Sequence, residues 1–435
     1  MSLCLAAGVV LFAACQREEL LSVDPEDAPG ISTPTLEVLL LPEDLAGWTD
    51  TVFSGFSGPS GATFIIAEDG SPNLTGRGLA RFQAPIQDSI FVIDTVSAAE
   101  RFDSLRFVLS LDTARTVLAS VGTTLQVRGV GDEWDNRSAD WEFAVDSPGV
   151  ATPWTAGPGG TLGAVLSEVF LEEKPDSVIF DLTAFSDSLL RLWNDTSQAN
   201  TGLAIVVADS GHLVAGIPRL HYNIIPEADP DTAIEVRCPS AISVFYCFPL
   251  KTYIFDQSAV PPAEGVLRIG GADGWRTFTE LVIPDSIPVE GYADPVPLRG
   301  STINRAELFL TSREAPPVPF AAEDTFGATA FELVDDFKLL GAKTPIGSEV
   351  REALFDVNPT DLAADSVVVI NVTSLIQAWA SVPRDSTALP VRFDLRARPE
   401  GTTFGYWEFG AAGGEPEKAP FLRLIFTPKA VFAFP

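Results

Sequence analysis

The stretch VIFDLTAFSDSLLRLW, from Val178 to Trp193, has a counterpart later in the chain, VVINVTSLIQAW from Val368 to Trp379. Each begins with residues rich in Val and Ile, reaches a Thr, and continues into a short apolar stretch that carries a Trp. An Asp-Ser pair stands just before each of them, at Asp176 and at Asp365. The two stretches lie 190 positions apart (368 − 178), which indicates an internal repeat and two similar modules.

Further segments repeat in the same order. Two closing segments both end in proline, IPRLHYNIIP (217–226) and APFLRLIFTP (419–428). Nearer the start of each half, three pairs correspond: TFIIAEDG (63–70) with TYIFDQSA (252–259), GLARFQAP (78–85) with WRTFTELVIP (275–284), and SLRFVLSL (104–111) with NRAELFLTS (304–312). The preserved order supports a duplicated module.

The pattern within each module is that of β-strands. Short runs rich in Val, Ile, Phe and Leu are separated by Gly, Pro, Asn and Asp. Examples are SIFVIDTV (89–96), TTLQVRGV (123–130), TGLAIVVAD (201–209), DSVVVINV (365–372) and LPVRFDLRA (389–397). Helical windows are AFSDSLLRLW (184–193), SLIQAWAS (374–381) and the weaker EVREALFDV (349–357). The sequence therefore predicts an all-β chain of two tandem jelly-roll β-sandwich modules.

Proline and acidic residues mark the predicted boundary between the modules. We expect the first module at 35–228, a linker at 229–249, the second module at 250–429 and an apolar tail, AVFAFP, at 430–435. The linker carries Cys238 and Cys247, close enough to close a small loop. A metal or redox pair is the alternative, but the spacing is not CxxC and no His lies nearby, which favours a structural disulfide in an oxidising compartment.

The N-terminus resembles a bacterial lipobox, because the apolar run from Leu3 ends in FAAC at Cys15. The resemblance implies that residues 1–14 are a signal peptide, that Cys15 carries a lipid, and that the acidic, Pro-bearing stretch 15–34 is a tether. The run is shorter than the roughly 20 residues of a membrane-spanning helix. A plain secretory peptide and an incidental Cys are the alternatives. Gln16, by resemblance to Gram-negative sorting rules, implies the outer membrane.

The charge balance limits the classes of partner. The chain of 435 residues has 59 acidic and 28 basic residues, a formal net charge of −31. Such a chain repels phosphate backbones, which excludes nucleic acid as a partner. Solubility alone explains the acids; binding of Ca²⁺ by acidic loops is the alternative. Asp132 and Asp135 in DEWDN are the candidate Ca²⁺ ligands, and no other cofactor is expected.

Several motifs together resemble the DNRLRE-type domain of secreted bacterial and archaeal proteins, which is similar to some carbohydrate-binding modules. The first half carries Trp134 and Trp141 in EWDNRSADWEF, then VIFDLT, NTGL (200–203) and PRLHYNI. The second half carries TYIFDQS, the run from Gly270 to Arg276, INRAEL, INVTSLIQAW and APFLRLIF. The resemblance covers nearly all of both modules. It implies jelly-roll modules of surface proteins, some of which bind glycans.

Aromatic rings near Gly, Pro or Asp are candidates for stacking on sugars. The carbohydrate-binding candidates are Trp134, Trp154, Trp275, Tyr406 and Trp407. Core packing is the alternative for each, and for Trp141, Trp193 and Trp379 core packing is the expectation. The basic residues Arg396, Arg398 and Lys418 form a small set that an acidic polysaccharide would need.

No common catalytic motif is present: the sequence lacks a GxSxG elbow, an HExxH helix and a Walker loop, and its two histidines, His212 and His221, read as strand residues. We expect a non-catalytic lipoprotein anchored at the cell surface that binds extracellular polysaccharide or contributes to surface architecture. One alternative is a structural subunit that self-assembles through strand edges, with 430–435 as an added strand. Another is a polysaccharide lyase or hydrolase.

Overall fold

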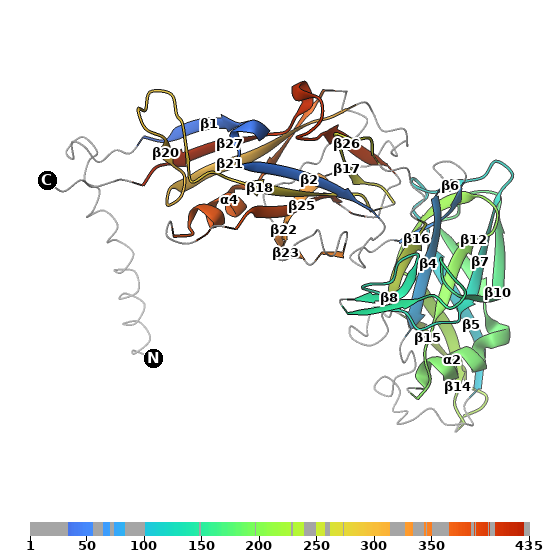
Figure 1. The fold of residues 1–435 in the computed structure, drawn as a ribbon. Helices are drawn as coiled ribbons and strands as arrows, with labels where there is room; N and C mark the ends of the chain where they lie inside the picture. The colour runs from blue at the N-terminus through green and yellow to red at the C-terminus, as the bar shows by residue number, and fades with distance from the viewer. Residues whose placement is uncertain are drawn as a thin grey trace, which may run out of the picture.

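The fold is seen in a computed structural model of the chain. It describes residues 34–54, 64–69, 74–82, 101–147, 149–195, 197–227, 229–238, 249–256, 262–272, 274–313, 327–333, 343–344, 346–349, 365–383, 387, 389–398, 400 and 405–429. Antiparallel β-strands dominate, as the sequence predicts, and they form two bodies, which we call the first and the second sandwich (Figure 1). The predicted all-β sandwich class is confirmed.

The first sandwich has a larger and a smaller sheet. The larger has the order β10 (Leu162–Leu171), β7 (Thr123–Val130), β12 (Leu203–Val207), β4 (Leu74–Phe82), β3 (Phe64–Asp69), β13 (Gly211–Ala215) and β6 (Val117–Leu118), with β16 (Pro249–Phe255) also on β4. The smaller has the order β11 (Ser177–Asp181), β5 (Arg101–Ser110), β14 (Arg219–Ile225) and β15 (Ile234–Cys238). A hairpin of β8 (Phe143–Ser147) and β9 (Val150–Pro153) lies outside both sheets.

The core of the first sandwich follows from alternation along the strands. In β14 every second residue is buried, so that Leu220, Tyr222 and Ile224 face inward. Phe107 on β5 and Phe180 on β11 meet there with ring centroids 6.0 Å apart. Large apolar side chains on one face of each sheet thus close the interior.

The second sandwich has the same kind of architecture. One sheet has the order β2 (Gly47–Phe53), β18 (Arg276–Val282), β25 (Val391–Arg398), β22 (Gly327–Leu333) and β23 (Ile346–Glu349), and the other has β1 (Leu36–Leu40), β27 (Phe421–Thr427), β21 (Thr302–Thr311) and β24 (Val367–Asn371). Two-stranded pairs add β17 (Val266–Gly270) with β26 (Tyr406–Gly410), and β19 (Ser286–Ile287) with β20 (Val296–Pro297). In the described part of the chain, short 3-10 helices are η2 (Pro42–Asp44) and η6 (Pro416–Lys418) here and η3 (Thr183–Phe185) in the first sandwich.

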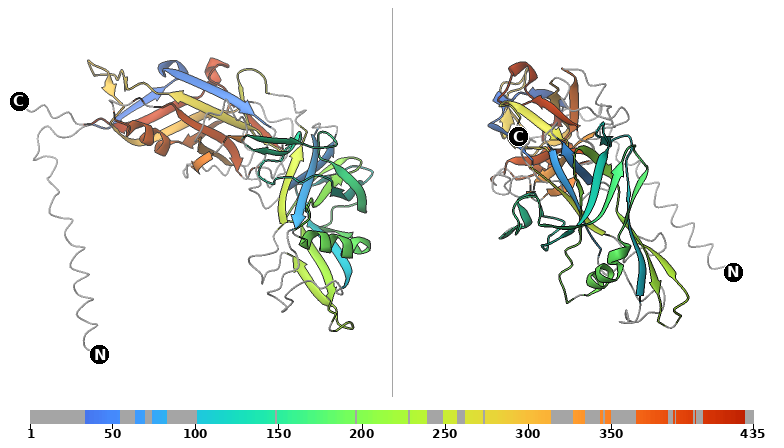
Figure 2. Two further views of the ribbon diagram at one scale, coloured as in Figure 1. Left: turned by 60° about the horizontal axis from the view of Figure 1, so that its bottom comes forward. Right: turned by 90° about the vertical axis from the view of Figure 1, so that its right-hand side faces the viewer.

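The strand pairing divides the chain differently from the predicted modules of 35–228 and 250–429. β1 pairs with β27 and β2 with β18, so residues 36–53 belong to the second sandwich. Conversely, β16 pairs with β4, so the start of the expected second module completes the first sandwich. The blue strands β1 and β2 accordingly lie among the orange and red strands in Figures 1 and 2. Periodicity identifies a strand and its buried face, but not its partner, which is why the boundary was misplaced.

The strand orders of the main sheets correspond between the two sandwiches. The order β11-β5-β14-β15 matches β24-β21-β27-β1, and β10-β7-β12-β4-β16 matches β23-β22-β25-β18-β2. Most of the predicted sequence pairs hold equivalent places. One pair does not: 63–70 forms β3, whereas 252–259 contributes to β16, whose equivalent is β2. We call 36–53 the N-terminal arm and 234–255 the linker arm.

Two predicted helices are present as α2 (Ser186–Asn194) and α4 (Thr373–Ala380), which bury Trp193 and Trp379. The third window, 349–357, lies outside the described residues except for Glu349 in β23, and so does the predicted strand 89–96. Among the described helices, none combines the length and apolar character of a membrane span.

Cys238 is buried and disulfide-bonded at the end of β15. Its predicted partner, Cys247, lies outside the described residues, as do residues 1–14, Cys15, the rest of the predicted tether up to residue 33, and the tail 430–435.

Candidate functional site

A tryptophan-bearing segment covers part of the first sandwich. Residues 131–161, between β7 and β10, fold over the outer face of the larger sheet; we call this segment the cap. It forms a second, smaller core, whose buried residues are Leu79, Val130, Trp134, Ala139, Trp141, Ala144, Trp154, Ala204 and Ile254. The cap therefore belongs to the packed interior on this side of the sheet.

The predicted sugar-stacking residues do not form an exposed platform. Trp134 is 2% exposed, and Trp154, Trp275 and Trp407 are each 3% exposed, while Tyr406 is half-buried. The neighbouring Gly, Pro and Asp residues correctly indicate loops for the first two, but the loop packs back onto the sheet. Burial of Trp141, Trp193 and Trp379, expected as core residues, is confirmed.

Hydrogen bonds fix the buried indoles of the cap. The Trp134 Nε1–H donates to the Thr201 carbonyl at 2.8 Å, and the Trp154 Nε1–H donates to the Asp140 carbonyl at 2.9 Å. The guanidinium of Arg81 lies 5.2 Å from the centre of the Trp134 ring. These rings stabilise the cap by burial, hydrogen bonding and cation–π contact.

In the second sandwich the aromatic candidates enclose an arginine. The guanidinium of Arg268 lies 4.7 Å from the Trp275 ring centre and 4.2 Å from that of Tyr406. Its Nε and Nη2 donate to one oxygen of Glu408 at 3.0 and 2.6 Å. An arginine stacked between two rings and paired with a carboxylate is a structural element of this sandwich.

Two of the three basic residues considered for binding acidic polysaccharides form ion pairs with acidic residues of the second sandwich. Arg396 is buried, and its Nε donates to both oxygens of Asp394 at 3.1 Å. Lys418 pairs with Asp365 at 3.0 Å. The side chain of Arg398 lies outside the described residues.

The two calcium candidates accept hydrogen bonds within the cap. Asp132 accepts from the backbone N–H and the hydroxyl of Thr155, at 2.8 and 2.7 Å, and from the hydroxyl of Thr161. Burial raises the pKa of Asp132, but these bonds outweigh it and lower the pKa. Asp135 accepts from the Ser138 hydroxyl at 2.7 Å. In the described part of the chain, no three His, Cys, Asp or Glu side chains converge as a metal site requires.

Beside the cap, the outer face of the larger sheet has a hollow of about 270 Å³. It is lined by Ala67, Glu68, Gly76, Arg77, Gln126, Arg128, Leu162, Val206, Val207 and Ala208. These residues come from β3, β4, β7, β10 and β12 and from the residue after β12. Polar side chains thus surround a small apolar floor.

Contacts with the cap and with β10 hold the polar residues of the hollow. Arg77 donates through Nη1 to the Gly159 carbonyl and lies 4.9 Å from the Trp141 ring centre. Burial lowers the pKa of Arg77, and the charge of Glu68 partly opposes this effect. The Arg128 Nε–H donates to the Gly163 carbonyl at 3.0 Å, and the Gln126 amide donates to Glu168 at 2.6 Å. The hollow therefore presents two held guanidinium groups in a strongly acidic chain.

Comparison with known proteins assigns no family. No family model matches the chain, and comparison with curated proteins gives no match. The C-terminal domain of the Streptococcus agalactiae AgI/II polypeptide BspA is 9% identical, with 91% of this chain and 92% of that chain covered, at a TM-score of 0.12. Infectious bursal disease virus, Gx strain, gives 13% identity, 94% and 81% coverage and a TM-score of 0.13. Scores this low establish no shared fold.

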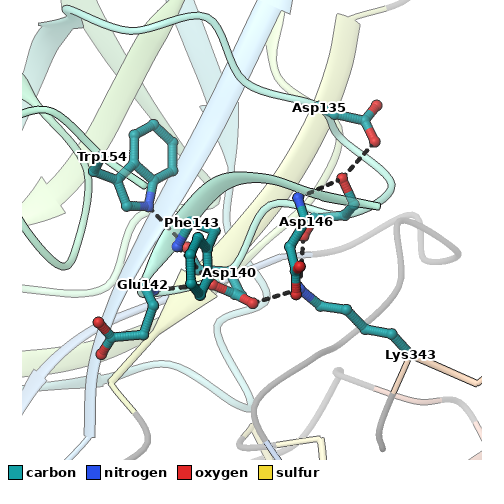
Figure 3. A network of polar contacts seen from close by, with 8 residues as sticks. Asp135, Asp140, Glu142, Phe143, Asp146, Trp154 and Lys343 are labelled. Atoms are coloured by element: carbon teal, nitrogen blue, oxygen red, sulfur yellow. Dashed lines mark hydrogen bonds and ion pairs between the residues drawn. The ribbon is translucent and has the colours of Figure 1, made fainter. Parts of the chain in front are cut away.

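Contacts of Lys343 join the cap to the second sandwich (Figure 3). Lys343, which precedes β23, extends its ammonium group to Asp140 and Asp146, at 2.5 Å in each case, and to the Ser138 carbonyl at 3.0 Å. Asp140 also accepts from the backbone N–H groups of Glu142 and Phe143. Lys343 thus links the two sandwiches through the segment that borders the hollow.

Sequence reasoning missed the residues of the hollow. In TTLQVRGV, Gln126 and Arg128 alternate with the buried Leu125 and Val127, which marks them as one polar strand face. That signal was present, but it does not distinguish a binding face from a solvated one. Only the packing of neighbouring strands brings these residues beside Arg77.

Proposed function

We propose that the protein is a non-catalytic cell-surface lipoprotein that binds extracellular polysaccharide through the hollow of the first sandwich. The observation that carries the proposal is the convergence of Arg77, Gln126, Arg128 and Glu68 around Val206 on an outer sheet face. Guanidinium, amide and carboxylate groups exchange hydrogen bonds with sugar hydroxyls, and the apolar floor accepts the C–H face of a sugar ring.

The charge distribution favours a sugar ligand over other polymers. A net charge of −31 repels nucleic acid, whereas Arg77 and Arg128 offer local positive charge. The same net charge repels a uronate polymer at long range, but a carboxylate that reaches Arg77 or Arg128 can accept charge-assisted hydrogen bonds from the guanidinium group. Neutral and acidic polysaccharides therefore both belong in the test.

The cellular location in this proposal is the outer membrane of a Gram-negative bacterium, through a lipid on Cys15. Its support is the lipobox resemblance at Cys15 and the acidic composition of 15–34, directly before β1. Mass spectrometry of the N-terminal peptide from cells tests it: we expect an acylated Cys15 at the mature N-terminus, and an unmodified peptide continuing upstream of Cys15 would contradict it.

The binding experiment uses the full chain with Cys15→Ser, screened on glycan arrays and on gels cast with a neutral glucan or a uronate polymer. We expect retention by at least one polysaccharide and a loss of about tenfold or more in affinity for Arg128→Ala, as expected for a charged hydrogen-bond donor. Arg237→Ala is the matched control, because Arg237 lies on β15 in the smaller sheet with 65% of its side chain exposed. Equal retention by the Arg128→Ala and Arg237→Ala variants, or no retention at all, would refute this site.

A further inference from the structure

The N-terminal arm packs on one sandwich and is covalently joined to the other. Its strands β1 and β2 pair with β27 and β18 in the second sandwich, and Glu37 on β1 contacts Arg423 on β27 at 2.8 Å. The next described strand along the chain is β3, which belongs to the first sandwich. The arm therefore depends for its packing on residues that come more than two hundred positions later.

The linker arm has the reciprocal arrangement. Its strands β15 and β16 pair with β14 and β4 of the first sandwich, yet the chain continues from β16 into β17 of the second. The N-terminal arm is followed in the sequence by the first sandwich but packs on the second. The linker arm is followed by the second sandwich but packs on the first. Because β1 and β2 occupy the places of β15 and β16, the chain already contains a strand exchange between its two halves.

A polar residue directs the N-terminal arm to the second sandwich. Asp50 on β2 accepts hydrogen bonds from the Thr279 hydroxyl at 2.8 Å and from the Ala412 backbone N–H at 3.2 Å. The sequence of β4, LTGRGLARF, places Gly76, Gly78 and Ala80 on the side that faces the main core. None of these three side chains can donate a hydrogen bond. If the N-terminal arm paired with β4 in place of β18, Asp50 would therefore lose the hydrogen bond that the Thr279 hydroxyl donates.

We propose that the N-terminal arm also exchanges between copies, so that the arm of one chain completes the second sandwich of a second copy of this chain. The exchanged contacts are the same as those within one chain, because β1 and β2 of one copy pair with β27 and β18 of the other; this is the condition for domain swapping. Reciprocal exchange between two copies gives a closed dimer. This inference is independent of polysaccharide binding, because the hollow lies on the other sandwich.

The register of β1 provides a direct test. Glu37 faces Ile425 across the antiparallel pair, and Cα atoms in such pairs lie about 4.5–5.5 Å apart, within the range that a disulfide bridges. Two full-length copies of different mass, both with Cys4→Ser and Cys15→Ser, are co-expressed in an oxidising compartment. One carries Glu37→Cys and the other Ile425→Cys. We expect a covalent heterodimer on non-reducing gels, with a yield that rises with expression level.

Two controls make the result decisive. A single chain with both Glu37→Cys and Ile425→Cys must form an intrachain disulfide, which checks the register. In the second control, one copy carries Gln126→Cys and the other carries Glu168→Cys. These residues face each other on β7 and β10, and both strands lie within the first sandwich. Exchange of the N-terminal arm does not bring them together from two copies, so this pair must give no heterodimer. Intrachain bonding without any heterodimer, or equal heterodimer yields for both pairs, would overturn the proposal, as would failure of the single-chain disulfide.

Discussion

The carboxylate of Asp50 accepts a hydrogen bond from the hydroxyl of Thr279 at 2.8 Å, although 229 positions separate the two residues in the sequence. The indole N–H of Trp48 donates to the same carboxylate at 3.0 Å. This polar contact joins β2 of the N-terminal arm to β18 of the second sandwich. Its energetic contribution can be measured without disturbing the first sandwich.

Thr279→Val should destabilise the second sandwich. The substitution removes the hydroxyl from a buried position with little change in volume, and it leaves Asp50 with fewer donors. The expected loss is about 1–3 kcal/mol of unfolding free energy. Urea unfolding followed by tryptophan fluorescence measures it, with Thr302→Val at an exposed position of β21 as control. Equal midpoints for the two variants would show that the contact contributes nothing.

Asp50 should make stability depend on pH in the mildly acidic range. Burial raises the pKa of Asp50, and the hydrogen bonds from Thr279, Trp48 and Ala412 only partly offset this effect. The native state therefore binds the proton more tightly than the unfolded state, and stability falls as pH rises from the unfolded pKa of about 3.9 through the raised native pKa. Asp50→Asn cannot titrate, so its stability curve over this interval should be flatter; an unchanged slope would contradict the assignment.

Lys343→Met should loosen the connection between the sandwiches. The substitution leaves Asp140, whose side chain is 8% exposed, and Asp146 without their shared cation. We expect a loss of about 1–3 kcal/mol and a broader distribution of distances between spin labels placed on the two sandwiches. Lys418→Met is the control, because its partner Asp365 is 69% exposed and such pairs contribute at most about 1 kcal/mol. A distance distribution as narrow as that of the wild type would refute the linking role.

The indoles of Trp134 and Trp154 do not line the hollow, so substituting them tests whether they stabilise the cap or contact a ligand. Trp134→Ala removes a large buried ring and should cost about 3–5 kcal/mol. Trp154→Phe removes the hydrogen bond to the Asp140 carbonyl and should cost about 1 kcal/mol. For Trp154→Phe, affinity electrophoresis should give the wild-type mobility shift. A loss of sugar binding by Trp154→Phe at unchanged stability would show that the Trp154 indole contacts the ligand.

The sequence predicts strands and helices well, because alternation and apolar content report burial directly. In β7 and β14, every inward position can be read from the pattern. The partners of the arms could not be predicted in the same way. LEVLL in β1 and IEVRC in β15 show the same alternation of exposed and less exposed residues. The pattern of apolar residues alone therefore fits either arm to either sandwich. The donors of Asp50 lie far away in the sequence and give no local signal.

The candidate site illustrates a second limit of sequence reasoning. Glycine and proline around Trp154 identify a loop, but whether a loop packs onto a sheet depends on the apolar face beneath it, here Leu79 and Ala204 on different strands. In the hollow, Arg128 is recognisable as an outward strand residue, whereas its proximity to Glu68 depends on the order of the strands. Convergence of residues from several strands requires the fold.

The arm has a mechanical consequence for a tethered protein. Its strand β1 begins at the end of the second sandwich remote from the first, and its strand β2 ends toward the first sandwich (Figure 1). Under anchoring at Cys15, drag on the first sandwich is transmitted along this arm as tension. The force then acts along the strands, parallel to the pairs β1–β27 and β2–β18. In this shear geometry the backbone hydrogen bonds of each pair bear the force together. A force that peeled a strand from its end would break these hydrogen bonds one at a time.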